Sequence, residues 1–242
     1  MCGKDRLRNL DLLSAGTLAG TLAGTEAASA EGRNGSEAPK KPNILFFLVD
    51  DLGWSDIGCF GSRFHETPNI DRLAEEGVRF TNAYAACHVS SPTRASLMTG
   101  RYPASIRLTD WLPGRKNWPF QRLLNAPVEQ HLPFEEITVA ETLRDNGYAT
   151  AIIGKWHLGK GDSNPLAHGF DEHIPLGYNE GWPQGYYAPF RLNGYEGEEG
   201  EYLTDVMTRE ATKYIEEHKD GPFFLYMSHF AVHDPIQGRK DL

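Results

Sequence analysis

The run Asn43-Ile-Leu-Phe-Phe-Leu-Val49 decides the fold class of this 242-residue chain. It is a continuous apolar run of strand length, which is typical of a strand buried on both faces of a parallel sheet. Asp50 and Asp51 follow it directly, and two carboxylates behind a buried strand are costly unless something pairs with them. A helix N-cap beside a solvated Asp is one interpretation. A hard cation at the carboxyl edge of the sheet explains both carboxylates together, and we favour it.

Segments farther along the chain predict how the sheet is built. A helix over 139–146, closed by Gly147, precedes a strand over 148–153, and another buried strand covers 222–227. Helices are also expected over 67–76, capped by Thr67, and over 204–218, capped by Thr204 or Asp205, with a short strand over 78–84. This order predicts an α/β fold with a mostly parallel central sheet flanked by helices.

The stretch from Tyr84 to Pro103 is predicted to be a loop that turns into a helix. Ser90 and Ser91 are N-cap candidates, and the helix continues to a stop at Gly100. Arg94 lies one turn inside, so a hydroxyl, free backbone N–H groups and a guanidinium gather at one place. Such a helix start can hold an anion, although on local chemistry alone an ordinary capped helix is the favoured interpretation.

Further polar side chains follow the other predicted strands. Lys155 and His157 come after the strand over 148–153, and His233 comes after the strand over 222–227. Because ligand sites of open α/β sheets gather along the carboxyl edge of the strands, we expect these residues to meet Asp50 and Asp51 in one pocket. Such a pocket would contain two carboxylates, a hydroxyl, an Arg, a Lys and two His. This set of groups could bind a cation and an oxyanion side by side.

Composition limits the possible partners. The chain has 24 Lys and Arg against 33 Asp and Glu, a net charge of −9. Such an acidic chain without a basic run is a poor candidate for binding nucleic acid or an anionic membrane surface. No stretch reaches the roughly 18 apolar residues of a membrane span. An anionic substrate would therefore need a local positive pocket.

The first 41 residues differ from the rest. Lys4, Arg6 and Arg8 precede a run rich in Ala, Gly, Leu and Thr, and Ala28-Ser29-Ala30 is similar to a cleavage site. Residues 1–41 are interpreted as a signal peptide or as a disordered leader and linker, which would make the protein periplasmic or secreted. Residues 42–242 form the predicted domain.

Cysteines and loops add little about chemistry. Cys2, Cys59 and Cys87 form no metal-binding pattern, and two small buried side chains are favoured over a Cys59–Cys87 disulfide. Long loops over 102–133 and 160–203 are rich in aromatic residues, notably at 111–118 and 178–190. They either face a substrate or simply pack.

Taken together, these motifs resemble those of the sulfatases, of the arylsulfatase type within the alkaline-phosphatase-like superfamily. The family signature is Cys or Ser, any residue, Pro or Ala, any residue and Arg, followed by Thr-Gly-Arg. It is present here as Ser90-Ser91-Pro92-Thr93-Arg94 and Thr99-Gly100-Arg101. The resemblance also covers 42–54, 67–85, 154–159 and 222–235. It implies that the chain is a sulfuric ester hydrolase with an alkaline-phosphatase-like fold.

The resemblance implies a modified nucleophile. Ser90 would be converted to formylglycine, an aldehyde whose hydrate attacks the sulfur of a sulfate ester and later expels sulfate. Asp50 and Asp51, with the oxygen of Ser90, would ligate a divalent cation, usually Ca²⁺.

The remaining roles also follow from the resemblance. Arg94 and Lys155 would hold the formylglycine and sulfate oxygens. His157 would steady the hydrate or assist proton transfer, and His233 would contact the sulfate and the leaving group. The substrate would be a sulfated small molecule, such as an aryl sulfate, or a sulfated carbohydrate.

The chain departs from the family pattern in three ways. The modified position is Ser90 rather than Cys, which implies an anaerobic radical maturase as a partner. Val232-His233 replaces the more common Pro-His, but the His is retained. Further metal ligands that the family places beyond the His233 region are absent, so we expect an N-terminal fragment whose C-terminal part is missing.

Two other functions remain open. Unmodified Ser90 could serve phosphate or phosphonate ester hydrolysis, which the Pro92 and Arg94 offsets disfavour. An inactive, truncated anion-binding chain is the second alternative, because two carboxylates underserve a Ca²⁺ ion that takes about six to eight oxygens.

Overall fold

The computed structural model describes residues 41–174, 183, 185–190 and 195–241. The predicted leader up to residue 40, and residues 178–182 and 184 of the aromatic loop over 178–190, lie outside the described residues. A compact unit begins at Lys41.

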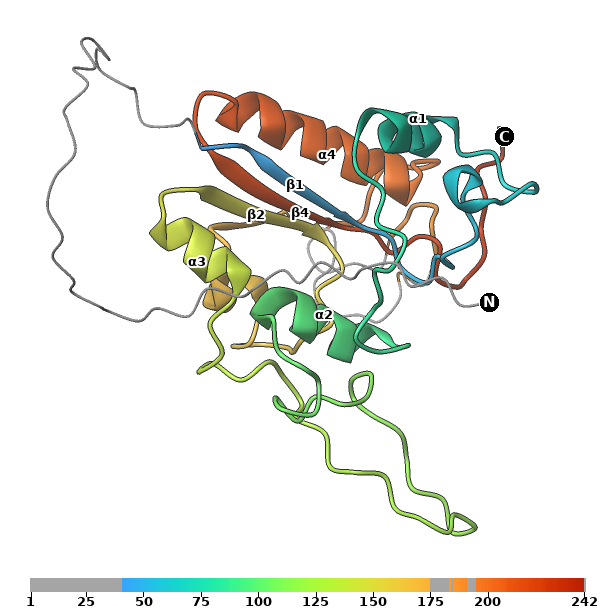
Figure 1. The fold of residues 1–242 in the computed structure, drawn as a ribbon, viewed down its shortest axis with the longest axis vertical. Coiled ribbons are helices and arrows are strands. Elements are labelled where there is room, and N and C mark those ends of the chain that lie inside the picture. The colour runs from blue at the N-terminus through green and yellow to red at the C-terminus, as the bar shows by residue number, and fades with distance from the viewer. Residues whose placement is uncertain (1–40, 175–182, 184, 191–194, 242) are drawn as a thin grey trace, which may run out of the picture. The chain divides into compact units, whose positions relative to one another are not determined.

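The described strands form one parallel sheet. Its order is β1 (Ile44–Leu48), β4 (Phe223–Ser228), β2 (Ala149–Gly154) and β3 (Glu172–Ile174) (Figure 1). Ser228 pairs with Leu48 on one side and with Gly154 on the other. The residues that follow these three strands therefore emerge side by side, which confirms the predicted parallel sheet and its shared carboxyl edge.

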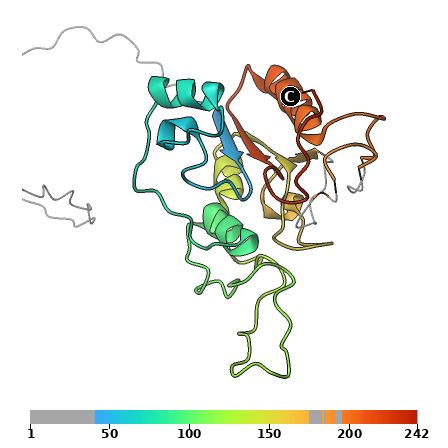
Figure 2. The same cartoon turned by 90° about the vertical axis from the view of Figure 1, so that its right-hand side faces the viewer.

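Helices cover both faces of β4 and β2, as Figures 1 and 2 show. Strand residues alternate between faces, so Phe223, Leu225 and Met227 pack with α4 (Leu203–His218). Phe224 and Tyr226 pack in a second cluster, with α2 (Ser90–Thr99) and α3 (Val139–Asp145). The continuous apolar sequence of β4 is thus explained by two hydrophobic cores, one on each face of the strand.

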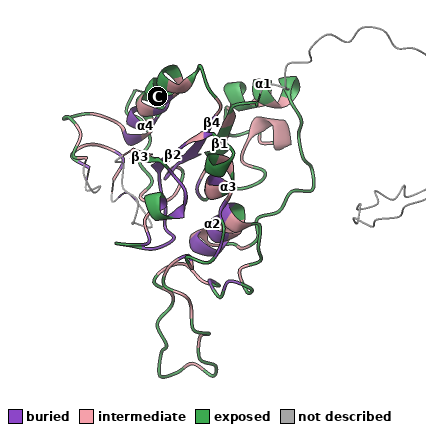
Figure 3. Ribbon diagram, turned by 90° about the vertical axis from the view of Figure 1, so that its left-hand side faces the viewer, coloured by how far each residue is buried: buried purple, intermediate pink, exposed green. Residues whose placement is uncertain are grey.

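Strand β1 differs from its prediction. It lies at an edge of the described sheet, and only Ile44, Phe46 and Leu48 pack into the core beside α2 and α3. Leu45 and Phe47 are 49% and 55% exposed, because α4 contacts β2 and β4 and leaves this face of β1 uncovered within the described chain (Figure 3). The prediction of burial on both faces is therefore wrong for the described residues.

Other local predictions also need correction. Residues 78–84 form no strand: Val78 and Phe80 are exposed, and no described strand pairs with them. Helix α1 (Pro68–Glu76) follows Thr67 as expected, but the Thr67 hydroxyl donates to Asp71 Oδ1 at 3.1 Å instead of capping the helix. The N-cap of α4 is Tyr202, two residues before Thr204 and three before Asp205, the two expected caps.

Two short 3₁₀ helices complete the described elements, η1 (Gly58–Phe60) and η2 (Pro165–His168). No helix of the described part is long and apolar enough to cross a membrane.

Thr138 supplies a testable contact at the start of α3. Its side chain accepts a hydrogen bond from Glu141 N at 3.0 Å and donates one to His168 O at 2.7 Å. We expect Thr138→Ala to lower the free energy of unfolding by about 1–2 kcal/mol, because a capping box and a buried carbonyl both lose their partner. Denaturant unfolding measures the change. Thr212→Ala is the control on an exposed face of α4, and an equal loss there would contradict the assignment.

Candidate active site

The nucleophile candidate lies at the first residue of α2. The helix begins at Ser90, and its N-cap is the extended residue Val89, which gives no side-chain cap. The prediction that Ser90 or Ser91 caps the helix is therefore wrong. Ser91 is buried, and its Oγ accepts a hydrogen bond from Leu112 N at 3.1 Å. The first-turn N–H groups of α2 are left without a side-chain cap, which favours an anion nearby.

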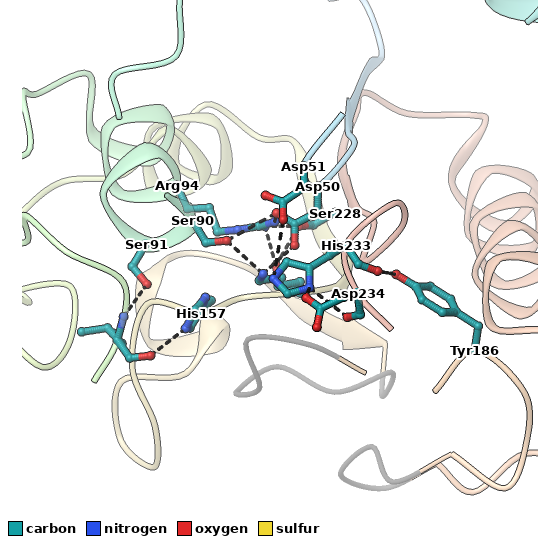
Figure 4. Close-up of polar contacts among 12 residues, drawn as sticks. Asp50, Asp51, Ser90, Ser91, Arg94, His157, Tyr186, Ser228, His233 and Asp234 are labelled. Atoms are coloured by element: carbon teal, nitrogen blue, oxygen red, sulfur yellow. Dashed lines mark hydrogen bonds and ion pairs between the residues drawn. The ribbon is translucent and has the colours of Figure 1, made fainter. Parts of the chain in front are cut away.

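A buried ion cluster lies directly beneath Ser90. Lys155 Nζ is 2.5 Å from Asp50 Oδ2, and Arg94 Nη2 is 3.3 Å from Asp50 Oδ1. Ser90 Oγ is 2.9 Å from Lys155 Nζ and 3.4 Å from Asp50 Oδ1 (Figure 4). The sheet edge and the start of α2 thus bring together four of the residues predicted from sequence.

The charges in this cluster shift one another's pKa. Burial lowers the pKa of Lys155 to about 8, helped by the positive charge of Arg94 and opposed by Asp50. Burial raises the pKa of Asp50, but the two neighbouring cations outweigh it, so the net shift is downward. Asp50 is therefore an anion at neutral pH and a poor general base.

Ser228 holds Arg94 in place and was missed by the sequence analysis. Arg94 Nη1 donates to Ser228 Oγ at 2.5 Å and to Lys155 O at 3.1 Å, and the Ser228 hydroxyl donates to Lys155 O at 2.7 Å. The sequence gives only a weak signal for it, a small polar residue at the end of an otherwise apolar strand.

His157 lies apart from the ion cluster. Its backbone has φ 55°, in the left-handed region, and its Nε2 is 3.0 Å from Leu112 O. Within the described chain no hydrogen bond joins it to Ser90, and Figure 4 shows His157 and Ser91 bonded to the same residue, Leu112. Burial, and then the charge of Lys155, lowers the pKa of His157 to about 4. The ring is therefore neutral at pH 7, with Nε2–H as the donor to the carbonyl of Leu112.

Asp51 and His233 lie next to each other at the site. Asp51 is exposed with φ 59°, and its Oδ2 is 3.7 Å from His233 Nε2. His233 Nδ1 is 2.8 Å from Asp234 Oδ1, a carboxylate that the sequence analysis did not single out. Strained non-glycine residues such as Asp51 and His157 are often found at functional sites.

A cavity of about 770 Å³ opens above these residues. The predicted residues that line it are Asp51, Ser90, His157 and His233, while Asp50, Arg94 and Lys155 are not part of its lining. Residues from 111–113 and 130–131 supply another part of its wall. Four of the seven residues predicted to share one pocket thus line this cavity, while the other three form the buried ion cluster.

The residues present do not by themselves complete a calcium site. Among the described residues no group of three or more His, Cys, Asp and Glu side chains could hold a metal ion. Asp50 already has two cationic partners, so it, Asp51 and the Ser90 hydroxyl fall short of the roughly six oxygens that Ca²⁺ takes.

The cysteines are not linked. Cys59 and Cys87 are both free, as the sequence favoured, but they are half-buried rather than buried.

Fold and site together define a class of protein. A parallel α/β sheet places a serine hydroxyl at a helix start, against a buried lysine, beside an open cavity. This is the arrangement of α/β enzymes that act on anionic esters through an activated oxygen.

Comparison with known proteins identifies the family within this class. The chain belongs to the sulfatase family, whose model matches residues 42–242. It is 37% identical over 237 residues to N-acetylgalactosamine-6-sulfatase from Canis lupus familiaris, covering 88% of this chain and 44% of the relative. It is 45% identical over 143 residues to steryl-sulfatase from Homo sapiens, covering 56% and 24%.

Comparison with solved structures agrees with the sequence comparison. The chain is similar to Ps i-CgsB in complex with k-i-k-neocarrahexaose, with a TM-score of 0.67, 35% identity and coverage of 84% of this chain and 48% of that one. The chain spans about half the length or less of the relatives named here.

Arg94 gives a test of the buried cluster. Replacing it in Arg94→Met removes hydrogen bonds to Ser228 and Lys155 O and one of the two cations beside Asp50. We expect a loss of about 3 kcal/mol in the free energy of unfolding, because removing one partner leaves buried polar groups uncompensated. Arg72→Met, which breaks an exposed pair with Glu76 at 3.9 Å, is the control and should cost less than about 1 kcal/mol.

His157 gives a second test. NMR titration should place the pKa of its ring near 4, well below the ordinary value, because burial disfavours the charged form. The signal is assigned by its loss in His157→Gln. Titration near pH 6.5 would contradict the tight packing of the ring against Leu112.

Proposed function

We propose that this chain carries the nucleophile of an enzyme that hydrolyses sulfate esters. The observation that carries the proposal is the position of Ser90, whose Oγ is 2.9 Å from the buried Lys155 ammonium at the edge of an open cavity. Membership of the sulfatase family supports the same activity.

Ser90 is the proposed site of formylglycine formation by an anaerobic radical maturase. The fit is favourable because Ser90 is only half-buried and lines the cavity, within the motif Ser90-Ser91-Pro92-Thr93-Arg94. When present, the modification supplies a carbon with two reactive oxygens in place of one hydroxyl.

The neighbouring side chains would prepare this position for chemistry. The Lys155 ammonium stabilises negative charge on an oxygen at Ser90, since the two atoms are in hydrogen-bond contact in a site of low polarity. Asp50 accepts from the Ser90 hydroxyl and so orients it. Arg94, held by Ser228, adds positive potential from below.

Two histidines would have different roles. His233 lines the cavity, and Asp234 at 2.8 Å holds its Nδ1, so Nε2 is directed toward Asp51 and the cavity for contact with sulfate or the leaving group. His157 binds the carbonyl of Leu112 and stays neutral. We propose that His157 positions the cavity wall through Leu112 and so helps to steady the modified residue at position 90.

A divalent cation, proposed as Ca²⁺, would take part of its ligands from Asp50, Asp51 and the oxygen of Ser90. These residues leave its coordination incomplete, because Ca²⁺ takes about six to eight oxygens. The cation would add a Lewis acid beside the ester oxygens.

The proposed substrate is a sulfated carbohydrate. Two relatives favour it by name, an N-acetylgalactosamine-6-sulfatase and Ps i-CgsB in complex with k-i-k-neocarrahexaose. A small aryl or steryl sulfate is the alternative that the steryl-sulfatase relative keeps open. The leader over residues 1–41 favours a periplasmic or secreted location.

Mass spectrometry of the Ser90 peptide tests the proposal. After coproduction with an anaerobic maturase, we expect the peptide to lose the mass of two hydrogen atoms, as oxidation of serine to an aldehyde requires. Ser90→Ala should lack this shift and lower aryl sulfate hydrolysis at least about 10³-fold.

Ser105→Ala, on an exposed turn, is the control and should retain both mass shift and activity. An unmodified peptide from a maturase-bearing host would contradict the mechanism. Turnover of a phosphate ester by that unmodified protein would favour the phosphatase alternative.

A further inference from the structure

Residues 114–129 form an arm that projects away from the sheet and helices (Figures 1 and 2). Both ends of the arm begin at the cavity. Trp111, Leu112 and Pro113 line the cavity before the arm, and Gln130 and His131 line it after the arm. Whatever the arm contacts is therefore next to the mouth of the candidate active site.

The arm has its own hydrogen bonds. Asn125 Nδ2 donates to the carbonyls of Arg115 and Lys116 at 3.2 Å each, and Asn125 N donates to Asn117 Oδ1 at 2.8 Å. Near the cavity, Gln130 Nε2 donates to Pro113 O at 3.3 Å. Hydrogen bonds thus join the outgoing and returning segments of the arm at its middle and at its base. The arm therefore has a defined conformation.

The arm carries unpaired positive charge in an acidic protein. Its one carboxylate, Glu129, pairs with Arg107 at 2.7 Å, and Arg115 pairs with Asp110 at 3.2 Å. Lys116 and Arg122 are exposed and have no ion-pair partner in the described chain. At the cavity, exposed Lys160 is equally unpaired. Against a net charge of −9, this local surplus favours an anionic ligand.

The arm also exposes large apolar side chains. The rings of Trp118 and Phe120 are stacked, with centroids 6.0 Å apart and an interplanar angle of 14°. Phe120, Leu123 and Leu124 are 81%, 83% and 82% exposed. An exposed apolar group of this size beside a polar cavity marks a binding surface, and flat aromatic rings can pack on the C–H faces of sugar rings.

We propose that the arm binds the continuing chain of a polysulfated polysaccharide whose sulfated end enters the cavity. This inference rests on the proposed sulfate-ester hydrolysis and goes beyond it, because it selects a polymer over a small sulfate. Lys160, Lys116 and Arg122 pair with successive sulfates, while Trp118 and Phe120 contact the sugar rings between them.

The observations favour this ligand over other occupants. A small aryl sulfate is accommodated by the cavity and leaves the arm unused. A second copy packed symmetrically on the same patch would bring Lys116 and Arg122 against themselves. An anionic membrane would attract the arm but would repel the rest of this acidic chain, and it does not explain why both ends of the arm begin at the cavity.

Binding of dextran sulfate by calorimetry tests the inference, with unsulfated dextran as the neutral polymer. We expect the wild-type chain to bind only the sulfated polymer, and more weakly as salt rises. The double variant Lys116→Ala/Arg122→Ala should bind about tenfold more weakly, since each exposed charge pair is worth a few-fold. Trp118→Ala/Phe120→Ala should also weaken binding severalfold.

Arg144→Ala/Lys213→Ala, which removes two exposed charges from α3 and α4, is the matched control and should bind like wild type. Equal binding by the arm variants, or an equal loss in the control, would overturn the proposal. Binding to phosphatidylglycerol vesicles without binding to dextran sulfate would also overturn it, in favour of a membrane.

Hydrolysis of 4-nitrophenyl sulfate by the matured protein separates this inference from the proposed function. Arm variants that lose dextran sulfate binding but keep this hydrolysis would support both proposals. Loss of polymer binding in the variants of a protein that hydrolyses no sulfate would support the arm as a binding site and contradict the proposed function.

Discussion

The structure depends on one buried electrostatic contact, the ion pair of Lys155 with Asp50, to which Arg94 is attached. Burying these charges is costly, and the cost is offset only because each partner has hydrogen bonds in a fixed geometry. Asp50 follows β1, Lys155 follows β2, and Arg94 comes from α2. The contact therefore joins the sheet to the helix that carries Ser90, and the position of the nucleophile candidate is a consequence of charge neutralisation.

The parallel sheet makes this contact possible. Because Leu48, Ser228 and Gly154 are at one level, the chain segments after three separate strands start from the same edge. The alternating side chains of β4 divide the apolar residues between two cores and fix the sheet between α4 on one face and α2 with α3 on the other. Core packing thus fixes the carboxyl edge of the sheet, and the position of this edge determines where the site residues lie.

Much of this could be predicted from sequence, for physical reasons. Buried parallel strands are long apolar runs, and polar residues that follow them gather at one edge, so Asp50, Lys155 and Ser90 were predicted to meet. Ser228 was missed because a single serine at the end of a strand gives little signal. The open face of β1 was missed because a run of apolar residues does not say which of its faces has a partner. The contact of His157 with Leu112 joins loops far apart in sequence, which no periodicity encodes.

The attachment of the arm determines which sequence changes this protein can tolerate. Leu112 is held by Ser91 and His157, and Leu132 N donates to Leu158 O at 2.7 Å. Both roots of the arm are therefore fixed to the segment that follows β2, while residues between them make few contacts with the body. Insertions, deletions or wholesale exchange of the arm could be tolerated without disturbing the charges below, so it is suited to evolve, or to be engineered, as a replaceable module.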